Sequence, residues 1–319
     1  MSIVILDSIG LNPGDLSFKD LEKYGNLTVY KKTETDEDII KRAKDADAIF
    51  IVYININEKI LKNLPKLKYI GVLSTGYDSI DLDLCKEYGI VVTNVPSYGS
   101  KVVAQHALAL LLEITTRIGH HDKEVKNYRW QKEGFWHFGD YPLVELYQKT
   151  VGIIGLGEIG LEAAKIYKAL GMKVLAYNRS KNKYALEYVE YVDLEYLYEN
   201  SDIIDLHLPL TKDTYDFIDK KAIEKMKNGV IIINTARGGL INEYDLRNGI
   251  DNGKIYAAGL DVVKNEPIPN DDPLLGYDNI IITPHMAWGP KETRKRLLDI
   301  AIKNFKGYLE GEDNINRLN

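Results

Sequence analysis

Short apolar runs alternate with amphipathic stretches along most of the chain. The apolar runs have the length of strands that are buried on both faces. The amphipathic stretches carry apolar residues at three- and four-residue intervals, as a helix with one buried side does. This alternation predicts an α/β fold in which helices cover parallel sheets. In the first part of the chain we expect strands at 3–6, 48–53, 69–72 and 90–93 and helices at 16–24, 36–45, 57–63 and 81–88.

A second series of strands and helices starts at residue 151. Between the two series lies a long helix at 101–119, and a final helix at 290–311 follows the last strand and is expected to pack back on the first series. A length of 319 residues suits two domains better than one core. The second series comprises strands at 151–154, 173–177, 203–206, 230–234, 255–260 and 280–283 and helices at 158–170, 220–227 and 243–251.

The segment 120–149 has no clear helical or strand period. It is polar and rich in aromatic residues, which often lie at an interface when they fall outside a periodic element. The aromatic and histidine side chains that stand out are Trp130, Phe135, Trp136, His137 and Phe138.

The second series opens with three glycines in the spacing G-x-G-x-x-G. Gly155, Gly157 and Gly160 lie between an expected strand and an expected helix, and another strand follows. In such a unit the first glycine permits a tight turn, the second lets the main chain approach a pyrophosphate, and the third lets helix and strand pack closely. The helix N-terminus adds N–H groups that favour an anion. An ordinary glycine-rich turn is the alternative, but the strand–turn–helix–strand context favours a dinucleotide site.

Composition and charge exclude several classes of function. A net charge of −6 lacks the basic surface that nucleic-acid binding needs. The single cysteine, Cys85, cannot form an internal disulfide, and we see no signal peptide, so we expect a cytoplasmic protein. Polar side chains interrupt the most apolar long run, 102–118, so no membrane span is expected. His120, His121 and His137 lack the spacing of a metal site, and no metal is expected.

Three polar residues follow successive strands of the second series. They are Arg237, Glu266 and His285. Because the carboxyl ends of strands in an open parallel sheet line one crevice, we expect these side chains to meet where the dinucleotide binds. Each has a structural alternative when taken singly: an arginine that caps a glycine loop, a glutamate in a solvated turn, or a histidine that supports the fold.

The chemistry of these three residues fits hydride transfer to or from a carbonyl carbon. When a nicotinamide moves a hydride, the substrate oxygen gains or loses a proton, and the imidazole of His285 can supply or accept it. A carboxylate beside it, that of Glu266, would favour the charged imidazolium. Arg237 can hold a 2-oxo acid through two parallel hydrogen bonds.

A loop of the first series is a candidate for binding the substrate carboxylate. Ser74, Thr75 and Gly76 follow the expected strand 69–72, and main-chain N–H groups there can bind a small anion. A plain connection, in which Asp81 caps the next helix, is an equally open interpretation.

The end of the strand 173–177 bears on the choice of dinucleotide. An NAD enzyme of this fold usually places an acidic residue there to bind the ribose 2′-OH. Asn178, Arg179, Ser180 and Lys181 stand there instead, so no acid repels a 2′-phosphate and basic side chains can bind one. This pattern favours NADP(H) over NAD(H). In the alternative, Asn178 bonds the 2′-OH and the basic residues are merely solvated.

Along essentially its whole length the chain resembles the D-isomer-specific 2-hydroxyacid dehydrogenases. The resemblance implies a Rossmann-type cofactor domain at 99–287, inserted into a flavodoxin-like substrate domain formed by 1–98 and 288–319. Both domains would be doubly wound parallel sheets. The motifs that carry the resemblance are TGYDSID at 75–81, AQHALALLL at 104–112, the glycine fingerprint, NTARG at 234–238, DV through EP at 261–267, and TPH at 283–285.

The resemblance also implies roles for individual residues. Arg237, Glu266 and His285 are expected to be catalytic, in the roles given above. Family members are usually homodimers joined through the cofactor domain, which gives segment 120–147 an expected place in the interface. The expected cofactor contacts are Val103, Gly155, Gly157, Glu158, Ile159, Gly160, Asn178, Arg179, Ser180, His207, Pro209, Thr235, Ala236 and Asp261, and the expected substrate contacts are Ser74, Thr75, Gly76, Arg237, His285 and Trp288.

Two stretches are most similar to glycerate dehydrogenases, also called hydroxypyruvate reductases. They read FGDYPLVEL at 138–146 and HMAWGPKE at 285–292. They imply NAD(P)H-dependent reduction of hydroxypyruvate or glyoxylate to the D-2-hydroxy acid. A dehydrogenase of D-lactate or of branched D-2-hydroxy acids is the alternative within the family. A dinucleotide-sensing binding protein, like the related C-terminal-binding corepressors, is the alternative of another class.

Overall fold

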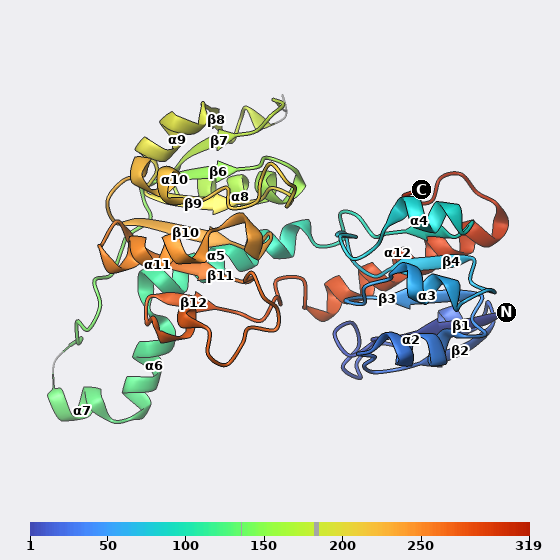
Figure 1. The fold of residues 1–319 in the computed structure, drawn as a ribbon. Helices are drawn as coiled ribbons and strands as arrows, with labels where there is room; N and C mark the ends of the chain where they lie inside the picture. The colour runs from blue at the N-terminus through green and yellow to red at the C-terminus, as the bar shows by residue number, and fades with distance from the viewer. Residues whose placement is uncertain (135, 182–184) are drawn as a thin grey trace. The chain divides into compact units, whose positions relative to one another are not determined.

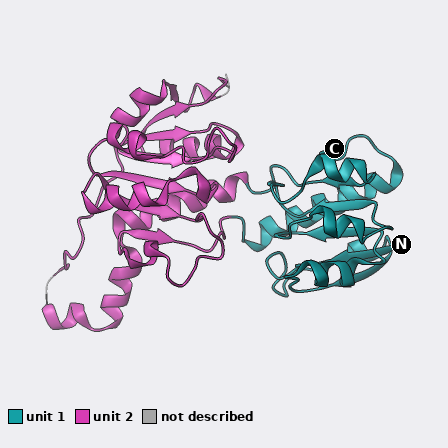
Figure 2. Ribbon diagram, viewed as in Figure 1, with its two compact units in different colours: residues 1–99, 288–319 teal, residues 100–287 magenta. Residues whose placement is uncertain are grey.

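The computed structural model describes residues 1–134, 136–181 and 185–319, which form two compact units (Figure 2). Unit 1 consists of residues 1–99 and 288–319, and unit 2 of residues 100–287. The division expected from the sequence placed the first boundary one residue earlier, whereas Gly99 lies in unit 1. Each unit is built around one parallel sheet, which confirms the α/β fold class.

Unit 1 has a five-stranded sheet in the order β2-β1-β3-β4-β5 (Figure 1). This is the flavodoxin-like order, in which the chain reverses its direction of travel once across the sheet. Its strands are β1 (Ser2–Ile5), β2 (Asn26–Val29), β3 (Ala48–Ile51), β4 (Tyr69–Val72) and β5 (Val91–Thr93), and its helices are α1 (Lys19–Glu22), α2 (Asp36–Ala43), α3 (Glu58–Lys62), α4 (Leu82–Glu87) and α12 (Lys291–Glu310).

Polar residues before the helices of unit 1 fix where those helices begin. The Thr35 hydroxyl accepts a hydrogen bond from the Asp38 N–H at 3.1 Å, which caps α2. The Asp81 carboxylate accepts one from the Leu84 N–H at 2.9 Å and caps α4. Such caps satisfy N–H groups that the first turn of a helix leaves without partners.

Two elements of unit 1 differ from the prediction. The strand β2 was not predicted, because it lies at the edge of the sheet and is largely exposed, so it has no apolar run. The helix expected over 16–24 is limited to α1, Lys19–Glu22, of which only Leu21 is buried.

The final helix, α12, packs on the sheet of unit 1. The Phe305 ring is fully buried, and its centroid lies 4.9 Å from that of Tyr69 and 5.4 Å from that of Phe50. Both partners lie on central strands, so the helix completes the core that residues 1–99 begin.

Unit 2 has a seven-stranded sheet in the order β12-β11-β10-β9-β6-β7-β8. Its first six strands in sequence follow the Rossmann order, and the strand order reverses between β6 and β9. The strands are β6 (Thr150–Ile154), β7 (Lys173–Tyr177), β8 (Glu190–Tyr191), β9 (Ile203–Leu206), β10 (Val230–Asn234), β11 (Ile255–Leu260) and β12 (Ile280–Ile282), and the helices are α5 (Ser100–Thr116), α6 (Ile118–Lys126), α7 (Arg129–Glu133), α8 (Glu158–Ala169), α9 (Leu194–Asn200), α10 (Lys220–Lys225) and α11 (Glu243–Asp251).

Helices cover both faces of the sheet in unit 2. The helices α5 and α8 pack on one face, where Tyr167, Ile153 and Ile233 share a core. The helices α9, α10 and α11 pack on the other, around residues such as Ile204 and Ile232. Strands buried on both faces explain the continuous apolar runs in the sequence.

The secondary structure of residues 117–149 differs from the prediction. The helix expected over 101–119 ends at Thr116, because Arg117 has a left-handed φ of 49° and starts the separate helix α6. The segment 120–149, expected to be irregular, contains most of α6 and all of α7. Phe135 lies outside the described residues. Among the helices of the described ranges, none is both long and apolar enough to cross a membrane.

Candidate active site

The glycine fingerprint forms a turn in which main chain packs on main chain. Gly155 has a φ of 96°, and a Cβ built on it would lie 2.5 Å from the carbonyl oxygen of His207. A Cβ on Gly160 would lie 2.2 Å from the carbonyl oxygen of Gly155. Apart from the adjacent main chain, none of the described residues comes within 4 Å of a Cβ built on Gly157. The first and third glycines are therefore required by close contacts within the protein, while the second leaves open space beside the turn.

This turn fits a dinucleotide. Gly157 is the N-cap of α8 and has no side chain to bond the first N–H groups of the helix. A helix N-terminus of this kind attracts a pyrophosphate. At the end of β10, the Thr235 hydroxyl is buried and has no hydrogen-bond partner among the described residues. A bound dinucleotide can supply the hydrogen-bond partner that the described residues do not.

The other expected cofactor residues lie around the same sheet edge. The Asn178 side chain accepts from the Leu156 N–H at 3.2 Å and donates to the Ser180 carbonyl at 2.7 Å, so it ties the end of β7 to the glycine turn. Arg179 and Ser180 are exposed. Glu158 accepts from the Ser100 hydroxyl at 2.9 Å, which joins the first turns of α5 and α8. The remaining expected contacts lie on α5 (Val103), in α8 (Ile159), after β9 (His207 and Pro209) and after β10 (Ala236).

The structure brings Glu266 and His285 together, as the strand-end pattern predicts. Glu266 Oε2 and His285 Nδ1 are 2.7 Å apart, and about a third of each side chain is exposed (35% and 32%). The other carboxylate oxygen of Glu266 accepts from the Val263 N–H at 3.1 Å, which orients the carboxylate toward the imidazole. Because Glu266 engages Nδ1, the opposite ring nitrogen, Nε2, is the one suited to a proton transfer.

A buried carboxylate supports the main chain at His285. His285 has a φ of 50°, a conformation that a non-glycine residue rarely adopts. Asp261 holds it there: its carbonyl accepts from the His285 N–H at 2.8 Å, and its carboxylate accepts from the N–H groups of Met286 and Ala287 and from the Thr283 hydroxyl. The Asp261 side chain is therefore engaged within the protein.

Hydrogen bonds explain why the buried carboxyl group of Asp261 is ionised. Burial alone would raise the pKa of Asp261. Hydrogen bonds from His106, Thr283 and the main chain outweigh that effect and hold the pKa of Asp261 below its ordinary value. His106, on α5, lies 3.3 Å from the carboxylate and 2.9 Å from the Thr283 hydroxyl. An ionised Asp261 can thus anchor the loop that carries His285.

Arg237 lies on a loop that touches the loop of Glu266. A Cβ on Gly238 would lie 2.0 Å from the Val263 carbonyl carbon, so the two main chains meet directly. The Asn234 amide donates to the Arg237 carbonyl at 2.9 Å and fixes the turn after β10. The loops of all three expected catalytic residues are thus held at the carboxyl edge of one sheet.

Sequence reasoning missed several residues that hold these loops. Glu243 accepts from the Lys264 N–H at 2.7 Å, and burial raises the pKa of Glu243. Asn234 and His106 play the supporting parts described above. Each stands within a motif already noted or at a helix start, but its partner comes from a different strand or helix, so spacing alone could not reveal the pairing.

Three of the expected substrate residues of unit 1, Ser74, Thr75 and Gly76, occupy the loop after β4. The Thr75 hydroxyl donates to the Val95 carbonyl at 2.9 Å, and the Asn94 amide donates to the Thr75 carbonyl at 2.7 Å. The Ser74 hydroxyl donates to the Gly76 carbonyl, which closes the loop on itself. The Trp288 ring lies 6.5 Å from that of Tyr53. A role for these residues in substrate binding stays a prediction.

Residues 108–287 match the family model described as the NAD binding domain of D-isomer specific 2-hydroxyacid dehydrogenases. The chain belongs to this family. The dehydrogenase is 49% identical to a hydroxypyruvate reductase of Blautia hydrogenotrophica over 98% of both chains, and 36% identical to a glycerate dehydrogenase of Methylorubrum extorquens over 97% and 96% of the two chains. It also shares the fold of an Escherichia coli D-lactate dehydrogenase, with a TM-score of 0.85, 30% identity and full coverage of both chains.

Family membership identifies the class of reaction that this site serves. The dehydrogenase is an oxidoreductase with an NAD(P)-binding domain, and the glycine turn of unit 2 lies inside the matched range. The described residues contain no group of three or more His, Cys, Asp or Glu side chains placed to hold a metal ion.

Changing Glu266 to Gln should lower the rate of reduction. A neutral amide cannot stabilise a proton donor at His285 as a carboxylate does. We expect a loss of about tenfold to a hundredfold in kcat/KM, since a hydrogen bond to a charged group contributes about 1.5–3 kcal/mol. The measurement is kcat/KM for 2-oxo acid reduction between pH 5 and 9. Glu224→Gln, on the exposed surface of α10, is the control, and an E266Q profile that coincides with the wild type would contradict the role of Glu266.

Proposed function

We propose that the protein reduces a small 2-oxo acid to the D-2-hydroxy acid with NAD(P)H, and that hydroxypyruvate or glyoxylate is its preferred substrate. The contact that carries this proposal is the 2.7 Å pair of Glu266 and His285. It places a carboxylate against one nitrogen of an imidazole at the edge of the sheet that carries the glycine turn. The substrate choice is supported by similarity to a hydroxypyruvate reductase and a glycerate dehydrogenase across nearly the whole chain.

Each side chain has a distinct task in this reaction. The nicotinamide supplies the hydride when it is bound. His285 delivers the proton from Nε2 to the carbonyl oxygen of the 2-oxo acid as that oxygen gains negative charge. Glu266 orients the imidazole through its contact with Nδ1. Arg237 binds the substrate carboxylate through parallel hydrogen bonds and so fixes the carbonyl carbon.

The first test is turnover of the purified protein. Hydroxypyruvate and glyoxylate should be reduced with loss of nicotinamide absorbance at 340 nm, and His285→Gln should lower kcat by a factor of about 10² or more, the usual contribution of a general acid. Pyruvate and branched 2-oxo acids are included, because the fold is shared with a D-lactate dehydrogenase. Preference for one of these would replace the substrate we propose. Absence of turnover with every 2-oxo acid, together with dinucleotide binding, would favour a sensing protein instead.

The end of β7 supports a preference for NADP(H). Asn178 is engaged with the glycine turn, while Arg179 and Ser180 are exposed directly after it. A 2′-phosphate beside these residues would find a guanidinium and a hydroxyl and no carboxylate.

We expect NADPH to give a higher kcat/KM than NADH. Arg179→Ala should lower kcat/KM with NADPH by about tenfold and leave that with NADH nearly unchanged, since only the phosphate loses a charged partner. Lys220→Ala, at an exposed site on α10, is the matched control for loss of a positive charge. A wild-type preference for NADH would refute the assignment.

Segment 120–147 is the proposed homodimer contact. It extends from unit 2 through α6 and α7 (Figure 1) and exposes several large apolar side chains. Trp136 is 94% exposed, and Tyr128, Leu143 and Tyr147 are each at least 60% exposed. Exposed apolar residues gathered on one segment are typical of a surface that another protein covers.

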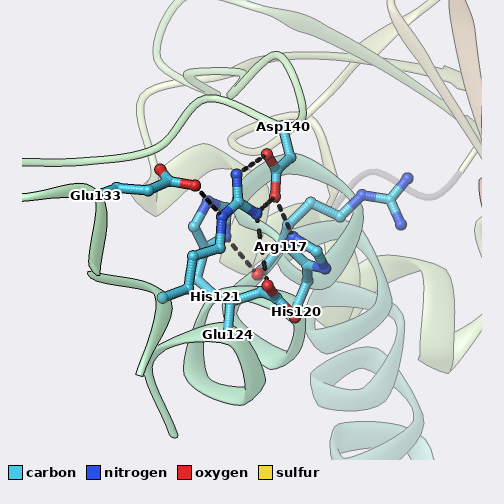
Figure 3. Close-up of polar contacts among 7 residues, drawn as sticks. Arg117, His120, His121, Glu124, Glu133 and Asp140 are labelled. Carbon is cyan, nitrogen blue, oxygen red and sulfur yellow. Dashed lines mark hydrogen bonds and ion pairs between the residues drawn. The ribbon is translucent and has the colours of Figure 1, made fainter. Parts of the chain in front are cut away.

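A polar cluster gives this segment a defined shape (Figure 3). Asp140 accepts from His120 Nε2 and from the Arg129 guanidinium at 2.7 Å each, and Arg129 also pairs with Glu133 at 2.6 Å. The Arg129 guanidinium lies over the Phe138 ring at 4.4 Å. These contacts connect α6, α7 and the residues at 138–140, so the exposed side chains project from an ordered support.

The wild-type protein should have the mass of a dimer in light scattering after gel filtration. A Trp136→Ser and Leu143→Ser double variant should be largely monomeric at the same micromolar concentration, because it removes about 1.5–3 kcal/mol of apolar burial at each residue. Tyr244→Ser, at an aromatic residue on α11 that is about as exposed as Leu143, should remain dimeric. A wild-type mass equal to that of one chain would exclude this interface.

A further inference from the structure

A carboxylate lies in the apolar core of unit 2, on the central strand β9. Asp205 is fully buried and pairs in register with Ile153 of β6 and Ile233 of β10. Taking an ionised carboxylate out of water is costly, and a well-packed apolar residue in its place is often as stable or more stable. Stability therefore does not explain why a carboxylate stands at position 205. The contacts of Asp205 indicate another role.

Two donors meet on one oxygen of Asp205. The Tyr167 hydroxyl, from α8, donates to Oδ2 at 2.7 Å, and His207 Nε2 lies 2.9 Å from the same oxygen. The other oxygen, Oδ1, has no partner among the described residues. Burial and the nearby carboxylate hold the pKa of Tyr167 well above its ordinary range, so the hydroxyl remains a donor. The carboxylate thus joins a helix on one face of the sheet to the residue that follows β9.

The side chain and the main chain of His207 lie in different surroundings. Its side chain is only 1% exposed, yet the residue as a whole is half-buried, so its exposed part is main chain. That main chain packs on the fingerprint: the His207 N–H donates to the Ile154 carbonyl at 2.8 Å, and the His207 carbonyl oxygen occupies the space where a Gly155 side chain would be. The imidazole therefore points into the core, where it contacts Asp205, and the peptide groups at 207 lie beside the glycine turn.

We propose that Asp205 and Tyr167 are positioning residues for the dinucleotide, which they serve by anchoring the His207 imidazole so that the main chain at 207–209 stays against the glycine turn. The expected contact of His207 with the cofactor is then made by its main chain. This inference rests on the NAD(P) site of the proposed function. It adds two residues that lie outside the fingerprint and outside the catalytic trio.

The test compares two tyrosine variants by direct binding. Tyr167→Phe removes the donor to Asp205, and we expect the Kd of NADPH and of NADH, measured by fluorescence titration, to rise about threefold to tenfold. At saturating dinucleotide, kcat should stay close to the wild-type value, because the catalytic loops are held by other contacts. Tyr198→Phe is the matched control: Tyr198 lies on α9, on the opposite face, and its buried hydroxyl has no partner among the described residues.

A second pair of variants tests the anchor itself. His207→Ala should weaken dinucleotide binding, and His207→Gln, which retains a side-chain N–H that can reach Asp205, should restore much of the affinity. Unchanged Kd values in both Y167F and H207A would overturn the proposal, as would an H207Q variant as weak as H207A. A wild-type protein that binds neither dinucleotide would instead overturn the proposed cofactor, so the two failures are distinguishable.

Discussion

Direct contact between main-chain segments is the constraint on which the site in unit 2 depends. The turn after β6, the segment after β9 and the loops after β10 and β11 touch at points where a side chain has no room. Gly155 meets His207, and Gly238 meets Val263. A single added methyl group at either glycine would force apart loops that carry different parts of the chemistry, because protein interiors are close-packed and cannot yield locally.

Polar side chains, two of them buried and one half-buried, then fix each loop in one conformation. Asp261 holds the left-handed His285, Asn234 holds the turn at Arg237, and Glu243 holds the main chain at Lys264. None of the three needs to touch the substrate. A catalytic side chain acts only within a narrow range of positions, and residues of this supporting kind determine that range.

The strands buried on both faces could be predicted from the sequence, because burial there leaves a continuous apolar run. The bounds expected for β4, β7, β9, β10 and β11 agree with the structure. The edge strand β2 and the helices α6 and α7 could not be recognised, because little of their surface is buried.

In the candidate active site, the strand-end pattern identified Glu266 and His285, whose side chains are in contact. It could not find Asp205 or His106, whose partners are brought to them by other strands and helices. The choice of dinucleotide and the dimer contact stay predictions, because each depends on a molecule other than this polypeptide.

The two-part construction of unit 1 has a consequence for biosynthesis. Unit 2 is one continuous stretch of sequence, whereas one face of the unit 1 sheet is fully covered only when α12 arrives from residues beyond unit 2. On the ribosome, residues 100–287 are therefore complete before Phe305 can seal the surface around Phe50 and Tyr69. During that interval residues 1–99 carry an uncovered apolar face, of the kind that chaperones bind. Unit 1 therefore cannot complete its core until the whole of unit 2 has been synthesised.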